Sequence, residues 1–352
     1  MLSSLPPELL RQIIESTVPS AYHSETYRSR QTTLCTLSLV SHRFRQIAQP
    51  LLRRVVHLLE LRYNSGSAEC ILSAASLKGW EEAVRQLVMH TEADTDKSGF
   101  AIDQIVAAYP RLAELVIASS RPLRQNELNA ISKLSELRSL HIGYCNLDPI
   151  HLPGLETLTL SEAYGQKGGL KAFLQPSMLP ALQALALFHI PQDDLLDLLC
   201  DPSSLLLLRQ VDALFVHASI FYNSDAILRK MQPFLSKALV HLNKNETSTR
   251  RRTLSTLPHL RLDFRPSCRS LVKDIERDQS GLKSLYLAIP RQAPHFGGLQ
   301  REQDRINLLA VCSAHKVEVI EEEQPSAWRY DPFISPEFWR RQRELKRLAG
   351  VQ

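Results

Sequence analysis

The fold is decided by the stretch Leu134–Leu147, which reads LSELRSLHIGYCNL. Its apolar residues have the spacing Leu-x-x-Leu-x-x-Leu-x-Ile, from Leu134 to Ile142. Cys145 and Leu147 come after this segment. Residues two apart in a β-strand point to the same face, so Leu140 and Ile142 are expected to enter one apolar core. The pattern predicts a short strand over residues 140–142 that is followed by a turn.

Shorter copies of this pattern recur along the chain. The copies with the spacing Leu-x-x-Leu-x-Leu, or Val or Ile in place of Leu, start at Leu112, Leu155, Leu182, Val211, Leu257 and Leu282. A degenerate copy is predicted at Val240–Leu242 and a last strand at Val317–Val319, with earlier divergent copies around Val56–Leu58 and Val84–Val88. Helical apolar spacing separates them, as in Leu128/Ile131/Leu134, Leu170/Phe173/Leu174, Leu195/Leu198/Leu199, Ile227/Leu228/Met231 and Leu271/Val272/Ile275. Such a unit buries its apolar faces only by stacking on its neighbours, which indicates a repeat array; an ordinary α/β domain with parallel strands is the alternative.

From Leu137 onward the deciding stretch resembles the leucine-rich-repeat template L-x-x-L-x-L-x-x-N/C-x-L at every specified position. The resemblance implies an α/β fold: an irregular solenoid with parallel strands on the concave face and helices on the convex face. The steps between strand leucines are uneven, because the step from Leu140 to Leu158 is much shorter than the step from Leu185 to Leu214. The array is therefore expected to be irregular.

The first sixty residues form a distinct unit. Leu5-Pro6-Pro7-Glu8 predicts a helix start, since proline suits the first turn and a carboxylate there favours the helix dipole. The polar residues 16–33 are expected to form a loop, and Leu34 to Ile47 a second amphipathic helix that ends at Pro50. Such short helices carry more apolar surface than they can bury among themselves. The unit is therefore either a docking module or a cap that packs on the following domain.

The segments LPPELLRQIIE and LCTLSLVSHRFRQIAQPLLRRVV resemble an F-box, in the form common in fungal proteins. The family's module binds a Skp-type adaptor, which connects it to a cullin scaffold and a ubiquitin-conjugating enzyme. The resemblance covers about residues 3–56. The residues it assigns to adaptor binding are Leu5, Pro6, Leu9, Leu10, Ile13, Ile14, Leu37, Val40 and Phe44.

Side chains that alternate with the inward leucines are expected on the open, concave face of the array. Aromatic and arginine side chains are favoured in binding hot spots, so this face is predicted to bind a target protein. The predicted target-binding residues are His141, Thr159, Phe188, Phe215, His217, His241, Arg261 and Tyr286. The alternative is that loop or helix insertions cover some of them.

The predicted domains are an F-box-like helical domain (1–56), divergent first repeats or a linker (57–109), the repeat array (110–320) and a C-terminal cap or tail (321–352). The tail is aromatic and basic. It either covers the last repeat, as solenoids require, or binds a partner as a peptide.

Composition narrows the class of protein. The 59 leucines against 12 glycines favour helices and leucine repeats over a glycine-rich nucleotide fold. A net charge of +5, without a basic stripe interleaved with aromatic residues, predicts no nucleic-acid partner. The chain has no apolar stretch long enough to span a membrane and no basic start before an apolar run, so neither a membrane span nor secretion is expected. The six cysteines lie far apart and are expected to be reduced thiols of a cytoplasmic or nuclear protein.

No motif for catalysis, metal binding or cofactor binding is present, so we expect no enzyme activity, no metal and no cofactor. The function predicted from both resemblances is substrate recognition in a Skp–cullin–F-box ubiquitin ligase. A repeat scaffold that binds Skp without ubiquitylation, or a protein-binding module unrelated to ubiquitin, is the alternative. A hidden enzyme is the third possibility.

Overall fold

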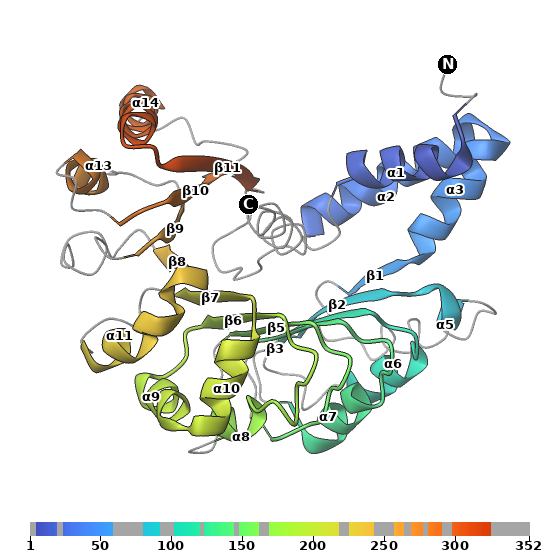
Figure 1. The fold of residues 1–352 in the computed structure, drawn as a ribbon. Coiled ribbons are helices and arrows are strands. Elements are labelled where there is room, and N and C mark those ends of the chain that lie inside the picture. Colours follow the sequence, from blue (N-terminus) through green and yellow to red (C-terminus); the bar gives the residue numbers. More distant parts are fainter. Residues whose placement is uncertain are drawn as a thin grey trace. The chain divides into compact units, whose positions relative to one another are not determined.

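The protein is described from a computed structural model, shown in Figure 1. The structure describes residues 5–19, 24–58, 80–91, 102–119, 123–143, 148–161, 169–217, 225–242, 257–263, 269–276, 281–290 and 298–324. The described residues divide into two compact units. Unit 1 comprises residues 1–156 with 178–181, and unit 2 comprises residues 157–177 with 182–352.

The fold is α/β, with an eleven-stranded parallel sheet whose strand order is the order along the chain. The strands of unit 1 are β1 (Val55–Leu58), β2 (Gln86–Thr91), β3 (Glu114–Ser119) and β4 (Ser139–Gly143). The strands of unit 2 are β5 (Thr157–Ser161), β6 (Ala184–Phe188), β7 (Ala213–His217), β8 (Ala238–Leu242), β9 (His259–Asp263), β10 (Ser284–Pro290) and β11 (Glu318–Gln324). Strands were predicted from the leucine pattern at each of these places. Strand β11 begins one residue later than the predicted start at Val317. Strand β2 extends to Thr91, beyond the predicted end at Val88.

Helices connect the strands. Unit 1 has α1 (Pro7–Thr17), α2 (Ser24–Val40), α3 (His42–Arg53), α5 (Trp80–Ala83), α6 (Ile102–Ala108) and α7 (Gln125–Ser132). Unit 2 has α8 (Gly169–Phe173), α9 (Gln192–Cys200), α10 (Pro202–Gln210), α11 (Asp225–Met231), the 3₁₀ helix η4 (Gln232–Lys237), α13 (Arg269–Glu276) and α14 (Gly298–Ala314). In unit 1, α6 and α7 lie on one face of the strands, and in unit 2 α9 and α10 lie on one face of β6 and β7 (Figure 1).

The leucine ladder has the predicted register over most of its length. Leu115 pairs with Leu140, Leu158 with Leu185, and Leu185 with Leu214. These side chains are all buried, as expected for a shared apolar layer. One step differs from the prediction: Phe215 pairs with Leu239, and His241 pairs with His217. The shift is two residues, so every side chain keeps its predicted face.

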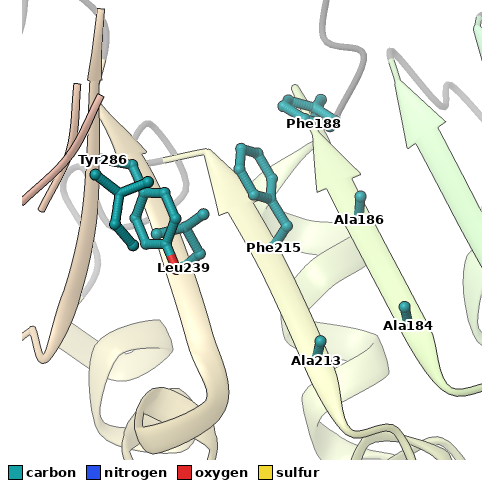
Figure 2. Close-up of a cluster of buried hydrophobic side chains, with 8 residues drawn as sticks. Ala184, Ala186, Phe188, Ala213, Phe215, Leu239 and Tyr286 are labelled. Atoms are coloured by element: carbon teal, nitrogen blue, oxygen red, sulfur yellow. The ribbon is translucent and has the colours of Figure 1, made fainter. Parts of the chain in front are cut away.

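The expectation of an open face opposite the leucines is wrong. Phe215 is 1% exposed, although it points away from the leucine layer, and Figure 2 shows it beside the labelled side chains of the neighbouring strands. Buried in the same way are His141, Thr159, Phe188, His217, Arg261 and Tyr286. Of His241 the structure describes only the backbone.

Side chains of neighbouring strands pack against one another on this face. The rings of Phe188 and Phe215, on neighbouring strands, lie with their centroids 4.7 Å apart. The small side chains Ala184, Ala186 and Ala213 belong to the same buried cluster and leave room for those rings. This cluster also includes Leu239, Tyr286 and Ile320. A parallel sheet that is buried on both faces is the usual arrangement for such strands.

Candidate docking surface on the N-terminal helices

The three N-terminal helices enclose a small apolar core of their own. It is formed by Leu10 and Ile14 of α1, Leu34 of α2, and Ala48 and Leu51 of α3. Leu10 and Ile14 were predicted to bind an adaptor, but the structure places both of them inside this core. Leu37 and Phe44, also predicted to bind it, are half-buried and pack against the same core.

Apolar side chains that do not enter this core are exposed on the helices. On α1, Leu9 is 47% exposed and Ile13 is 41% exposed, and their spacing of four residues places them on one stripe of the helix. Val40, at the end of α2, is 63% exposed. Pro6 is exposed and Leu5 is half-buried. Of the residues predicted to bind an adaptor, Leu9, Ile13 and Val40 therefore remain exposed outside the core and available to a partner.

Leu39 is the residue that sequence reasoning missed. It is 79% exposed, the largest value among the large apolar side chains of the described residues. The available signal was its spacing: Leu39 is five residues after Leu34 and therefore lies about 140° around the helix from it. We call Leu9, Ile13, Leu39 and Val40 the docking surface.

Two contacts fix the junction between α2 and α3 near the start of α1. Ser41 has an extended backbone and its hydroxyl accepts a hydrogen bond from the backbone N–H of Phe44 at 3.3 Å, which caps α3. The Arg43 guanidinium donates to the backbone carbonyl of Leu5. The end of α2, which carries Leu39 and Val40, is thereby held beside the residue that precedes α1.

The helices are also attached to the first strand. The ring of Tyr27 on α2 meets the ring of His57 on β1 edge-on, with centroids 5.0 Å apart. Burial raises the pKa of the Tyr27 phenol above its ordinary value. A phenol is neutral at physiological pH already at its ordinary pKa, and the raised pKa of Tyr27 extends the pH range over which this buried contact between α2 and β1 is uncharged.

Two expectations for this region are wrong. The segment predicted as a loop over residues 16–33 already belongs to α2 from Ser24 onward, and the predicted single helix from Leu34 to Ile47 is divided at Ser41. Pro50 does not end α3 but lies inside it, and the helix continues to Arg53 with Leu51 buried in the core. Polar composition misled the first expectation: Arg28 and Ser29 of α2 are exposed, but the polar Thr26 of the same segment is buried.

Comparison with known proteins gives no family for this chain. No family model matches it, and no curated protein matches it. Within the described ranges, no helix is long and apolar enough to cross a membrane. In the same ranges, no group of three or more histidine, cysteine, aspartate or glutamate side chains is placed to hold a metal ion.

Proposed function

We propose that this protein is a substrate-recognition subunit of a Skp–cullin–F-box ubiquitin ligase. In this proposal the docking surface on α1 and α2 binds the Skp-type adaptor, and the chain that follows the helices binds the target protein. The observation that carries the proposal is the exposure of Leu9 and Ile13 on a helix whose neighbouring apolar residues, Leu10 and Ile14, are buried. Exposed apolar residues that share one stripe of a helix, opposite those in its core, support a partner-binding role for that stripe.

The order of the sequence segments gives further support. The stretch that resembles an F-box lies over α1, α2 and α3, and the stretches that resemble leucine-rich repeats lie over successive parallel strands with intervening helices. The target-binding role predicted for His141, Thr159, Phe188, Phe215, His217, His241, Arg261 and Tyr286 stays a prediction. Those of these side chains that the structure describes are buried, so their primary contribution is to the stability of the sheet.

The test is co-purification of a Skp-type adaptor with the full chain. The double substitution Leu9→Glu with Ile13→Glu should abolish adaptor binding, because it places two charges on the exposed stripe while leaving Leu10 and Ile14 in the core. Circular dichroism and thermal unfolding should match the unsubstituted protein.

The matched control is Leu206→Glu with Ile306→Glu. These residues, on α10 and α14, are 55% and 49% exposed, so the control exchanges the same residue types at similar exposure. It should leave adaptor binding unchanged. Undiminished adaptor binding by the Leu9/Ile13 variant would reject the proposal. Recovery of cullin together with the adaptor supports a ligase, whereas adaptor without cullin supports the scaffold that binds Skp without ubiquitylation.

A further inference from the structure

A basic surface cleft lies in unit 1, on a different part of the helices from the docking surface. Its volume is about 830 Å³, and it is lined by residues of α1, α3 and α5 and by residues that precede β2, β3 and β4. Five arginines line it, namely Arg11, Arg45, Arg53, Arg54 and Arg85, together with His42. The two acidic residues of the lining are Glu82 and Glu136.

The acidic groups near the cleft are already shared between arginines. Glu136 accepts from Arg85 at 2.9 Å and, through its other oxygen, from Arg111 at 2.9 Å. The hydrogen bond from Arg111, together with the charge of Arg85, holds the pKa of Glu136 below its ordinary value. Outside the lining, Glu15 lies 3.2 Å from Arg11 and 3.4 Å from Arg54. One carboxylate therefore serves two guanidinium groups in each case.

Positive charge in the cleft is left without an acidic partner. Arg53 is exposed at the end of α3 and has neither an ion pair nor a hydrogen bond with the described part of the chain. Among the described residues, Arg45 donates only to the backbone carbonyl of Ser38, at 3.1 Å. These guanidinium groups retain donors for a ligand, because each carries five N–H groups.

The backbone fixes the spacing of two of the arginines. The carbonyl of Arg54 accepts from the backbone N–H groups of Arg85 and Gln86 at 2.8 Å and 3.1 Å, just before β1 and β2 begin to pair. The carbonyl of Arg85 in turn accepts from Ala113 and Glu114, at the start of β3. Arg54 and Arg85 thus occupy successive positions of one parallel ladder, where neighbouring strands lie roughly 4.8 Å apart. The backbone positions of the two arginines are therefore fixed before a ligand binds, and only their side chains remain to be ordered.

We propose that this cleft binds an acidic peptide segment of a partner protein. Guanidinium groups bind carboxylates through paired, charge-assisted hydrogen bonds. A nucleic-acid strand presents a continuous row of phosphates, which the exposed Glu82 would repel. A peptide presents separate carboxylates to the arginines and can direct a backbone N–H group to Glu82. The proposal does not depend on adaptor binding, since none of the docking-surface residues lines the cleft.

The test measures binding of the full chain to a fluorescein-labelled twelve-residue peptide rich in aspartate and glutamate. Fluorescence anisotropy should detect binding that weakens as salt is raised, because screening acts on exposed charges. The variant Arg53→Gln with Arg54→Gln should lose at least about tenfold in affinity, as expected when charge-assisted contacts are removed. The variant Arg28→Gln with Arg209→Gln removes two exposed arginines that do not line the cleft and should bind within about twofold of the unsubstituted protein.

Arg53→Glu is a second variant for the same binding measurement. The Arg53 side chain makes no ion pair or hydrogen bond with the described residues, so the substitution leaves the backbone ladder intact. It should also weaken peptide binding by about tenfold or more. The same peptide with glutamine and asparagine in place of its acidic residues should not bind. Equal loss in the Arg28/Arg209 variant, or tighter binding of a single-stranded oligonucleotide than of the acidic peptide, would overturn the proposal.

Discussion

Phe215 shows how one side chain can be assigned to the correct face of a strand and still have an unexpected role. Its place opposite the leucine layer follows from the alternation of side chains along β7. Its burial does not follow from alternation, because it depends on Phe188 of β6 and on the alanines beside both rings. A short-range pattern predicts the direction of a side chain, whereas its exposure depends on residues that are distant in sequence.

Substitution of Phe215 by alanine should therefore lower the free energy of unfolding by about 3–5 kcal/mol, because it removes a buried ring. A Phe215 exposed on an open face would instead have cost little stability on truncation. Leu185→Ala, on the opposite face of the neighbouring strand, should cost about 2–5 kcal/mol. Urea unfolding followed by circular dichroism measures both values.

The control for this pair is Leu206→Ala, which truncates an exposed leucine and should change stability by less than about 0.5 kcal/mol. A loss of less than about 1 kcal/mol in the Phe215 variant would contradict the packing described for the cluster.

Asp201 is a second residue whose role is local and testable. Its carboxylate accepts from the backbone N–H of Ser204 at 2.9 Å and from the Ser204 hydroxyl at 2.9 Å, which caps α10. Lys171 lies 3.2 Å away. The backbone hydrogen bond from Ser204, above all, lowers the pKa of Asp201 below its ordinary value.

Asp201→Ala should cost about 1 kcal/mol near neutral pH, the usual loss for an N-cap. Because the folded-state pKa is lowered, the stability that ionisation contributes is present above the ordinary aspartate pKa. It is lost as the pH falls through the lowered value. The difference between the unsubstituted protein and the alanine variant should thus shrink in acid. Thermal unfolding at pH 7 and at about pH 3 measures this difference.

The control is Asp201→Asn, which keeps a side-chain acceptor and should retain most of the cap at pH 7. A stability difference between the unsubstituted protein and Asp201→Ala that grows in acid would contradict the assignment.

At the scale of elements, the strands were far more predictable than the helices at the N-terminus. Each strand repeats the same leucine spacing, so weak copies support one another. The boundary between α2 and α3 has no such repetition and lies at Ser41, which has an extended backbone and caps α3. Helices α5, α6, α10 and α14 were also not predicted. On α6 and α10 the buried residues, such as Ile105 and Leu207, pack against neighbours that the local sequence does not reveal, whereas Leu206 of α10 is exposed.

Ser41→Ala should destabilise the N-terminal helices by about 1 kcal/mol, because α3 loses the side-chain acceptor for the N–H of Phe44. Ser41→Asp should keep the cap, since an aspartate side chain accepts the same hydrogen bond. Urea unfolding monitored by hydrogen exchange at the α3 amides distinguishes the two variants. Equal stability of the alanine and aspartate variants would show that the hydroxyl does not cap the helix.

At the scale of the whole molecule, sequence reasoning predicted an α/β fold with parallel strands, and the structure confirms it. The sequence did not reveal the division into two compact units at residue 156, which lies within the predicted repeat array. Contact density decides that division, and the leucine pattern continues through it. Most of the predicted region 57–109, and the tail from residue 325 onward, lie outside the described residues.

The order of the strands has a consequence for how the protein is made. Strand starts follow one another at short intervals along the chain, the closest from Ser139 to Thr157 and the widest from Ser284 to Glu318. Each strand also lies next to its predecessor in the chain. A ribosome therefore releases every strand after the neighbour on which it forms, and no pairing waits for a segment from the far end of the chain. Such sequential contacts shorten the loops that must close during folding. Nascent chains should thus acquire protease-resistant structure progressively during translation, long before residue 352 leaves the exit tunnel.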